Sequence, residues 1–331
     1  MDLIHANADR AEIGVVSDFE KFDAQLHANC KIEDNTFALT MSLAAWNADK
    51  IMKDDFLYID STEFGGVVSS VEKDTGDDLV TVKGCLWRGM LAKRIIRPPA
   101  GQGYLTFENI ELNAMISNVI GGMFGSLIEV SDANTGTTIS AQFRYQTVLQ
   151  GLSSALKKAG YTLSCIYEAI RQKVVLSARK ITDYSDADDI SPDLGIGMTT
   201  KAGRIDDYNH VIALGSGELE ARTVIDLYMI DGKVYTARPA SLPETALKSF
   251  VFDYPNAEDA DTLTASATDA LLDYAAESTA AVDTSQAQLD LLLDDVILVI
   301  DRDLSISQKK SVSQLLLTIS SSGEKIETEV S

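Results

Sequence analysis

Short runs of β-branched and aromatic residues, separated by polar turns, dominate the first hundred residues of the chain. Residues 55–60, 66–71 and 79–82 are typical of strands. The turn at residues 73–77 lies between the last two runs, and Gly76 within it can supply a positive φ. The pattern predicts an antiparallel meander.

A change of composition at residues 97–101, Arg-Pro-Pro-Ala-Gly, indicates a domain boundary. Beyond it, apolar residues recur twice at the spacing of a helix face: Leu112, Met115, Ile116 and Val119, then Tyr145, Val148, Leu149 and Leu152. We expect Asn109 to cap the first helix and Gly121 to end it, and Gly160 to end the second after two lysines. A hairpin over 161–167 and 173–178 and an acidic loop over 183–193 follow, which predicts a small α+β domain.

Strand patterns return after residue 200, at 210–214, 223–228 and 233–236. Residues 258–277 carry one more helical pattern, with Ala267, Ala270, Leu271 and Tyr274 on one face. The chain then ends in strands.

A weak internal repeat links the two β-rich regions. Asp54-Asp55 and Asp294-Asp295 each precede a strand, a short connection, a second strand, a glycine turn and a third strand. The glycines of the two turns are Gly76 and Gly323. Two β-domains of one design would give this pattern, with the second interrupted by the helix near 258–277, but any two meanders share the same order of elements.

Length and composition describe a globular protein. A chain of 331 residues can form two or three cores, and 45% of the residues are hydrophobic. No run approaches the roughly 18 apolar residues of a membrane helix, so we expect no membrane span. The N-terminus lacks the basic start and apolar stretch of a signal peptide, which predicts synthesis in a cytoplasm.

The charge balance is strongly negative. Fifty acidic residues against 28 basic ones give a formal net charge of −22. Wrapping nucleic acid or docking on anionic lipid requires clustered Lys and Arg, which this chain lacks. The charge fits either simple solubility or a surface past which DNA slides without binding. Composition does not choose between these two explanations.

Candidate chemistry is sparse. Cys30, Cys85 and Cys165 lie far apart, so we expect small buried hydrophobes rather than disulfides or a zinc site. The SxxK matches at Ser154 and Ser177 lack the partner boxes of serine acyl enzymes. We therefore predict no catalytic residues and no cofactor.

Other motifs are also better explained without a reaction. Gly215-Ser-Gly217 lacks the lysine of a phosphate loop and predicts a β-turn. The acidic loop lacks the glycine and terminal Glu of a calcium loop, so we expect no metal there. We expect the three histidines, His5, His27 and His210, to be isolated surface or core-edge residues. Trp46 and Trp87 are expected in the core of the first β-domain, although exposed tryptophans would favour carbohydrate binding.

Residues 36–96 carry a resemblance to a known family. Thr36–Leu43, Trp46-Asn47, the strand at 55–59, Gly65-Gly66-Val-Val, the hairpin to Gly84 and Arg94-Ile-Ile-Arg97 follow in order. This succession resembles the opening of siphophage tail hub proteins, which share the baseplate-hub fold. The strands at 209–214 and 292–299 also lie where that family has them, so the resemblance covers most of the chain.

The resemblance implies a β-rich α+β fold with two tail-tube-like antiparallel β-barrel or sandwich domains. The predicted limits are 1–97 for the first, 98–200 for the small α+β domain, and 201–331 for the second. It further implies a non-enzymatic homotrimer at the virion tail tip, which adapts a sixfold tail tube to a threefold tip. The expected partners are the distal tail protein ring or tail tube, the tape-measure protein, and a tail spike or fibre, with DNA only in passage during ejection.

Two readings from other classes stay open. A carbohydrate- or peptidoglycan-active enzyme would need two carboxylates that converge in a cleft. A carbohydrate-binding β-module would need exposed Trp46 and Trp87. Neither reading requires the internal repeat.

Overall fold

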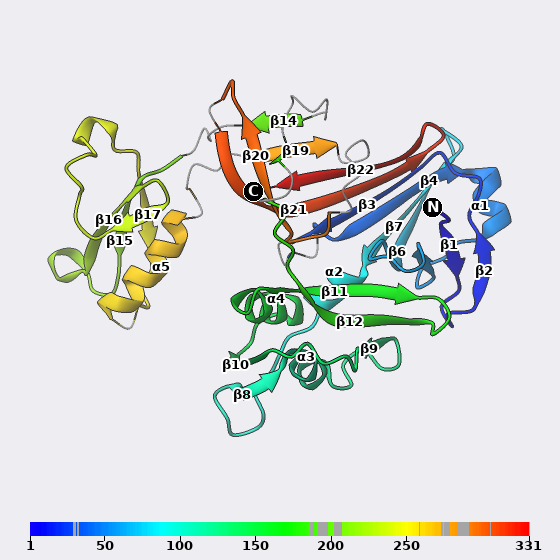
Figure 1. The fold of residues 1–331 in the computed structure, drawn as a ribbon, viewed down its shortest axis with the longest axis horizontal. Helices are drawn as coiled ribbons and strands as arrows, with labels where there is room; N and C mark the ends of the chain where they lie inside the picture. Colours follow the sequence, from blue (N-terminus) through cyan, green and yellow to red (C-terminus); the bar gives the residue numbers. More distant parts are fainter. Residues whose placement is uncertain are drawn as a thin grey trace. The chain divides into compact units, whose positions relative to one another are not determined.

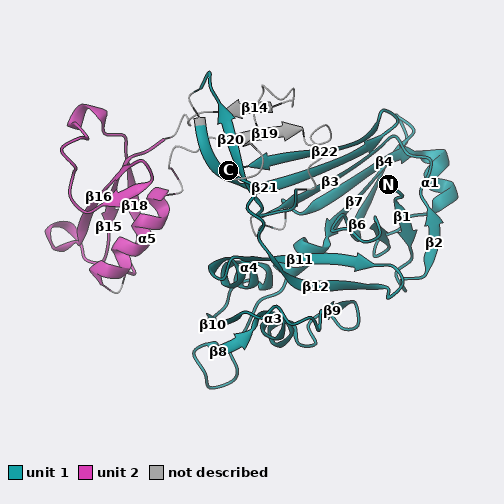
Figure 2. Ribbon diagram, viewed as in Figure 1, with its two compact units in different colours: residues 1–198, 281–330 teal, residues 199–280, 331 magenta. Residues whose placement is uncertain are grey.

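The structure is a computed structural model of the chain. It describes residues 1–28, 31, 33–185, 189–190, 198–201, 207–257, 259–272, 274, 279–283, 291–304 and 306–330. Two compact units divide the chain, one comprising residues 1–198 and 281–330 and the other residues 199–280 with 331 (Figure 2).

A 13-stranded sheet contains most strands of the first unit (Figure 1), and two of its strands, β14 and β19, cross the limits between the units in the sequence. The strand order is β14-β19-β22-β21-β3-β4-β7-β6-β5-β1-β2, with β20 beside β21 and β13 beside β20. The bounds are β1 Ile4–Ala6, β2 Glu12–Val15, β3 Lys21–His27, β4 Thr36–Ser42, β5 Phe56–Tyr58, β6 Gly65–Asp74, β7 Leu79–Leu86, β13 Asp189–Ile190, β14 Met198–Lys201, β19 Thr279–Asp283, β20 Val296–Asp301, β21 Ile306–Ser320 and β22 Gly323–Val330.

Alternation of buried and exposed residues explains why these segments form a sheet with one covered face. Every second residue of β3 and β4 is buried, which is the period of a strand with one face on the core. Phe22, Leu39 and Val82 form one fully buried row across three strands. Two short helices, α1 Leu43–Asp49 and α2 Trp87–Ala92, follow β4 and β7 directly.

A smaller α+β region belongs to the same unit. Its elements are β8 Leu105–Glu111, α3 Leu112–Ile120, β9 Ile128–Val130, β10 Thr138–Phe143, α4 Val148–Lys158, β11 Tyr161–Glu168 and β12 Lys173–Lys180. Helix α4 packs against β11 and α3 against β12 and β9 (Figure 1). Leu149, Leu152 and Leu156 are fully buried at the helical spacing that predicted α4.

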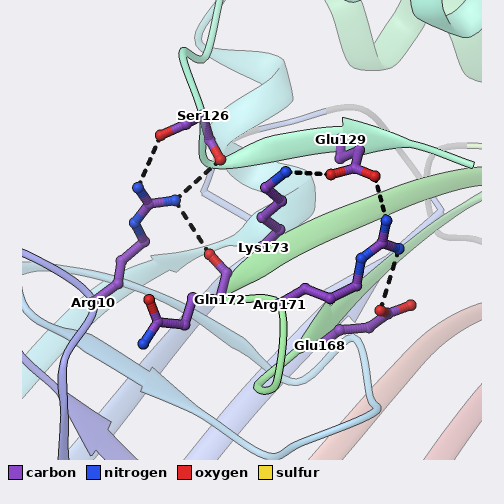
Figure 3. Close-up of polar contacts among 7 residues, drawn as sticks. All are labelled: Arg10, Ser126, Glu129, Glu168, Arg171, Gln172 and Lys173. Carbon is purple, nitrogen blue, oxygen red and sulfur yellow. Dashed lines mark hydrogen bonds and ion pairs between the residues drawn. The ribbon is translucent and has the colours of Figure 1, made fainter.

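Polar contacts fasten this region to the N-terminal hairpin of the sheet (Figure 3). Arg10, in the turn between β1 and β2, donates to the carbonyl oxygens of Ser126 at 3.0 Å and Gln172 at 3.2 Å. Next to it, Arg171 and Lys173 both form ion pairs with Glu129. The hydrogen bond from Lys173 is the main reason that the pKa of the Glu129 carboxyl is lowered. The β11–β12 turn is thus held to both the sheet and β9.

The second unit contains its own sheet, in the order β17-β16-β15-β18, with one helix. Its elements are β15 His210–Leu214, η2 Leu219–Ala221, β16 Val224–Ile230, β17 Lys233–Tyr235, η3 Glu244–Ala246, β18 Ser249–Asp253 and α5 Ala260–Leu272. Leu263, Ala267 and Leu271 of α5 are fully buried in a cluster with Val211 and Leu227. The predicted helical face over 258–277 is therefore confirmed within these shorter bounds.

The predicted fold class, a β-rich α+β protein with few helices, is confirmed. The C-terminal strands, however, belong to a different sheet from the one expected. The sequence predicts one domain over residues 201–331, whereas β20, β21 and β22 join the sheet begun by the first ninety residues. The physical reason lies in β21, whose Leu315 and Leu317 are buried where the strand pairs with β3. Leu315 pairs with Leu26 and Leu317 with Ala24, so the two strands present buried residues on the same side of the sheet.

Three local expectations also need correction. Glu111, not Asn109, caps α3, because its carboxylate accepts the N–H of Ala114 at 2.9 Å. Gly76 does not provide the positive φ of its turn; Asp78 does, with φ 56°. Tyr145 precedes α4 and is 67% exposed, while the Thr147 side chain caps that helix.

Candidate functional site

The acid pair Asp54-Asp55 builds a compact hydrogen-bonded corner between β5 and β6. Asp54 has φ 73° and donates its N–H to the carbonyl of Val68 at 2.9 Å. Val68 returns a bond from its N–H to the carbonyl of Asp55 at 2.8 Å, and the Asp55 carboxylate accepts the N–H of Met52 at 2.7 Å. Asp is among the few residues that tolerate this left-handed conformation, which explains its place in the motif.

The second acid pair forms the same corner between β20 and β21. Asp294 has φ 69° and donates to the carbonyl of Val312 at 2.9 Å. Val312 donates to the carbonyl of Asp295 at 2.8 Å, and the Asp295 carboxylate accepts the N–H of Leu292 at 3.0 Å. All three bonds of the first corner therefore recur, which confirms that the repeat is structural.

The strands around the two corners correspond as well. β6 pairs with β5 and β7, and its register with β7 shifts just after Val68. β21 pairs with β20 and β22, and its register with β22 shifts just after Val312. The next strand beyond β7 is β4, and the next beyond β22 is β19. One sheet thus contains two equivalent modules, which we call the first and the second module.

The uncovered face of this sheet carries mostly polar and small side chains, with Leu316 as an apolar exception. Directly paired residues lie on the same side of a sheet, so rows of paired residues define the face. We call this surface the polar face and define it by three rows of paired residues. They are Glu327, Leu316, Gln25 and Thr36; Lys325, Thr318, Asp23, Ala38, Lys83 and Ser70; and Ser320, Lys21, Thr40, Thr81 and Glu72.

Each lysine of the polar face lies beside a carboxylate of the same face. Lys21 Nζ is 2.8 Å from Asp23, and Lys83 Nζ is 3.0 Å from Glu72. Lys325 Nζ is 2.8 Å from Glu327. These exposed pairs add little stability. Their consequence is electrostatic, because a paired lysine offers less attraction to a phosphate backbone than a free one.

A fully buried arginine has structural contacts with two other elements. Arg88 of α2 is 1% exposed and donates to the Leu163 carbonyl at 2.6 Å and to Glu63 at 3.2 Å. Burial is the largest influence and disfavours its charged form, but Glu63, Cys165 and Asp294 together outweigh burial and raise the pKa of the guanidinium. Glu63 also accepts the N–H of Cys165 at 3.1 Å. Arg88 and Glu63 therefore tie the β5–β6 loop and α2 to β11.

The two described cysteines are buried free thiols, as predicted, while Cys30 lies outside the described residues. Burial raises the pKa of the Cys165 thiol, and the nearby Glu63 carboxylate raises it further. Burial likewise raises the pKa of Cys85. A thiol held protonated is a poor nucleophile, so neither site resembles a reactive cysteine.

The SxxK matches do not form nucleophile–base pairs. Lys157, three residues after Ser154 on α4, pairs with Asp294 at 2.7 Å. Ser177 and Lys180 lie three residues apart on strand β12, so their side chains point to opposite faces. Gly215 opens the loop that returns the chain from β15 into β16, and its N–H bonds the carbonyl of Thr223, but residues 215–217 form a bend rather than the predicted β-turn.

Two of the histidines are buried and bonded, in contrast to the expected isolation. His5 Nε2 lies 3.1 Å from Asp55. His210 lies 2.7 Å from the Ser249 hydroxyl and 3.0 Å from Asp226. Sequence reasoning missed this Ser–His–Asp chain because the three residues come from three different strands.

The hydrogen-bonded residues Ser249, His210 and Asp226 are not arranged like the catalytic site of a hydrolase. Ser249 and Asp226 are exposed on the sheet of the second unit, on the face away from α5. His210 lies on β15, the central strand, which pairs on both sides with β16 and β18. Backbone amides engaged in such ladders do not form an oxyanion hole. We therefore assign His210 a structural role.

Both tryptophans pack against other residues, Trp87 fully buried and Trp46 half-buried. Trp87 is 1% exposed and stacks on Phe56 and Tyr167, and Trp46 donates to the carbonyl of Ile51. Among the residues that the structure describes, no three His, Cys, Asp or Glu side chains gather as metal ligands. Part of the acidic loop, including Asp186, Asp188 and Asp193, lies outside them. No helix within the described ranges is long and apolar enough to cross a membrane.

Three solved tail proteins have a fold similar to that of this chain. The chain is similar to the 43 kDa tail protein of prophage MuSo2 from Shewanella oneidensis, with a TM-score of 0.58 and 12% identity over 100% of this chain and 98% of that one. It is also similar to a tail protein from Neisseria meningitidis MC58, with a TM-score of 0.53 and 11% identity over 99% and 95% of the two chains.

A third similar structure is the prophage tail protein gp18 from Listeria monocytogenes EGD-e, with a TM-score of 0.53 and 11% identity over 100% and 94% of the two chains. No protein-family model matches the sequence. A search of curated proteins also finds no match. The predicted resemblance is thus confirmed at the level of the fold: this chain has the fold of phage tail proteins.

Proposed function

We propose that this chain is a structural subunit of a phage or phage-like tail, located at the tail tip, and that it catalyses no reaction. The observation that carries the proposal is the pair of equivalent modules in one sheet, within a fold shared over the full chain with tail proteins. A tail tube is built from repeated β-modules around a central passage. A chain with two such modules supplies two positions of that ring.

Three copies would then supply six modules, so the proposed assembly is a homotrimeric ring that joins a sixfold tube to a threefold tip. The proposed neighbours are the distal tail protein ring or the tail tube on one side, a spike or fibre on the other, and the tape-measure protein inside. We retain the tube-like design of both modules as part of this proposal.

The polar face is the surface that we assign to the DNA passage. Its side chains are short or paired, and its three lysines each lie beside a carboxylate. A net charge of −22 repels the phosphate backbone and prevents tight binding during ejection. DNA is therefore proposed to pass without sequence-specific contacts.

Immunogold labelling tests the location. Antibodies against the purified chain are applied to particles from the strain that encodes it, and gold is expected only at the end of the tail distal to the capsid. Label on the capsid or along the whole tail would contradict the proposal. Light scattering and negative-stain images of the purified chain test the ring separately, with a threefold particle with an open centre as the expected result.

A further inference from the structure

One edge of β6 has no partner strand over half of its length. The strand pairs with β7 from Gly66 to Asp74, but with β5 only from Gly65 to Val67. Along Ser70–Asp74 the outer edge therefore faces no other strand of the described chain. Unpaired backbone groups on such an edge are a template for another strand.

The equivalent edge in the second module is covered. The first part of β21 pairs with β20 from Ile306 to Ser311, and the second part pairs with β3 from Gln314 to Ser320. Because Val68 and Val312 are equivalent, the stretch that begins at Ser70 corresponds to the stretch that begins at Gln314. Strand β3 of the first module thus pairs with the edge of β21. The equivalent edge of β6 has no such partner.

Burial at matched positions shows what the missing strand leaves exposed. Val71 follows the register shift of β6 as Leu315 follows that of β21. Leu315 is 4% exposed beside Leu26 of β3, whereas Val71 is only partly buried. An added strand at the β6 edge would cover Val71 in the same way.

The opposite end of the sheet offers the complementary strand. β3 neighbours β4 and then β7 in the first module, and β14 neighbours β19 and then β22 in the second. β14 is therefore the counterpart of β3, and it ends the sheet. Its sequence Met-Thr-Thr-Lys carries one positive charge, whereas Ser70–Asp74 carries two acidic residues against one lysine.

We propose that β14 of a second copy of this chain pairs with Ser70–Asp74 of β6, as β3 pairs with β21 within one copy. The inference rests on the proposed role as a ring subunit and names the contact between copies. Each copy contributes β14 to one neighbour and binds the β14 of another neighbour at its β6 edge. The interface is therefore heterologous and repeats until the ring closes. The contact within the chain and the contact between chains then share one design.

Site-specific photo-crosslinking tests this pairing. A photoreactive phenylalanine replaces Ser70, and a mixture of ¹⁵N-labelled and unlabelled copies is irradiated, both as the purified oligomer and in isolated tails. We expect crosslinked peptides of mixed isotope content that contain residues 198–201. The matched control replaces Thr40 of β4, which lies between β3 and β7 in the sheet interior, and should give no such product.

Hydrogen exchange provides a second readout without any substitution. Amides of residues 70–74 and 198–201 are expected to gain protection together as the concentration rises and copies associate. The edge strand β2 serves as control and should not change. A crosslink from position 70 to another segment, unchanged exchange in an oligomer, or a chain that stays monomeric in both preparations would overturn the pairing.

The outcomes separate this inference from the proposed function. Gold at the tail tip without the 70-to-198–201 crosslink would leave the function intact and reject the interface. The crosslink without label at the tail tip would leave the interface intact and reject the location.

Discussion

Asp55 and Asp295 accept equivalent backbone hydrogen bonds in the two modules, but their second partners differ. Each carboxylate bonds the N–H of the residue three positions before it, Met52 at 2.7 Å and Leu292 at 3.0 Å. Asp55 also lies 3.1 Å from His5. Asp295 instead pairs with Arg179 at 2.7 Å. The corner is thus kept, while each module connects it to different surroundings.

This difference predicts unequal costs of removing the two carboxylates. Asp295→Ala leaves the Arg179 guanidinium without its partner and should cost about 3–5 kcal/mol, the range for breaking a buried ion pair. Asp55→Ala removes mainly hydrogen bonds and should cost about 1–3 kcal/mol. Urea unfolding followed by circular dichroism measures both. Asp303→Ala in an exposed turn is the control and should stay within about 0.5 kcal/mol of the wild type; equal values for all three would contradict the structural role of the corners.

The buried pair of Arg88 and Glu63 gives a second prediction. Arg88→Met leaves the Glu63 carboxylate uncompensated and should lower the free energy of unfolding by about 3–5 kcal/mol. The double variant Arg88→Met with Glu63→Gln removes both charges and should recover part of that loss. Strictly additive effects in the double-mutant cycle would show that the two groups do not interact.

Two glycine substitutions test the close packing of the first module. A Cβ on Gly66 would meet the carbonyl oxygen of Cys85 at 2.0 Å, so Gly66→Ala should destabilise the protein by about 1–3 kcal/mol or more. Gly103 has open space around its Cβ position, and Gly103→Ala should be neutral or stabilise by up to about 1 kcal/mol. Thermal unfolding of both variants checks the contrast, and a stable Gly66→Ala protein would refute the predicted clash.

The sequence predicts the elements of this fold better than their partners. Alternation and helical spacing locate β6, β7, α3 and α4, because each pattern is local and depends on one face being buried. The acid pairs also reveal the repeat, since a positive φ favours Asp at one fixed place in the motif. These predictions depend only on residues close in the chain.

Pairing between distant segments is not encoded in such patterns. Nothing in the alternation of β21 distinguishes β3 from another strand as its neighbour, and the polar face arises only from that pairing. Ser249, His210 and Asp226 likewise meet through the order β16-β15-β18, which the sequence does not state. The cap of α3 was predicted wrongly for a simpler reason: Asn109 and Glu111 are both polar and lie only two residues apart.

A pH-dependent prediction concerns Asp183. The Ser185 hydroxyl and N–H and the Lys309 ammonium stabilise its charged form and lower the pKa of the carboxyl to about 2. Since the pKa in the folded state lies below the ordinary value of 3.8, the stabilisation is present above about pH 4 and is lost as the pH falls through 2. Asp183→Asn should therefore unfold with a shallower pH dependence between about pH 4 and 2. Urea midpoints measured across that range provide the check, and parallel curves for variant and wild type would contradict it.

The last prediction concerns the lysines of the polar face. If carboxylates screen Lys21, Lys83 and Lys325 from DNA, neutralising those carboxylates should create affinity where the wild type has little. The triple variant is Asp23→Asn, Glu72→Gln and Glu327→Gln.

Fluorescence anisotropy with a labelled duplex measures the gain. Neutralising the three carboxylates should produce binding whose logarithm falls with the logarithm of salt at a slope of up to about −3. The control variant makes the same change in net charge at exposed residues that are not part of this face, with Asp9→Asn, Asp269→Asn and Asp303→Asn. Binding by the triple variant alone would support the ion pairs as a device against DNA adhesion, because the overall charge of the two variants is equal. Equal binding by both would assign the effect to net charge and reject the polar face as a specialised surface.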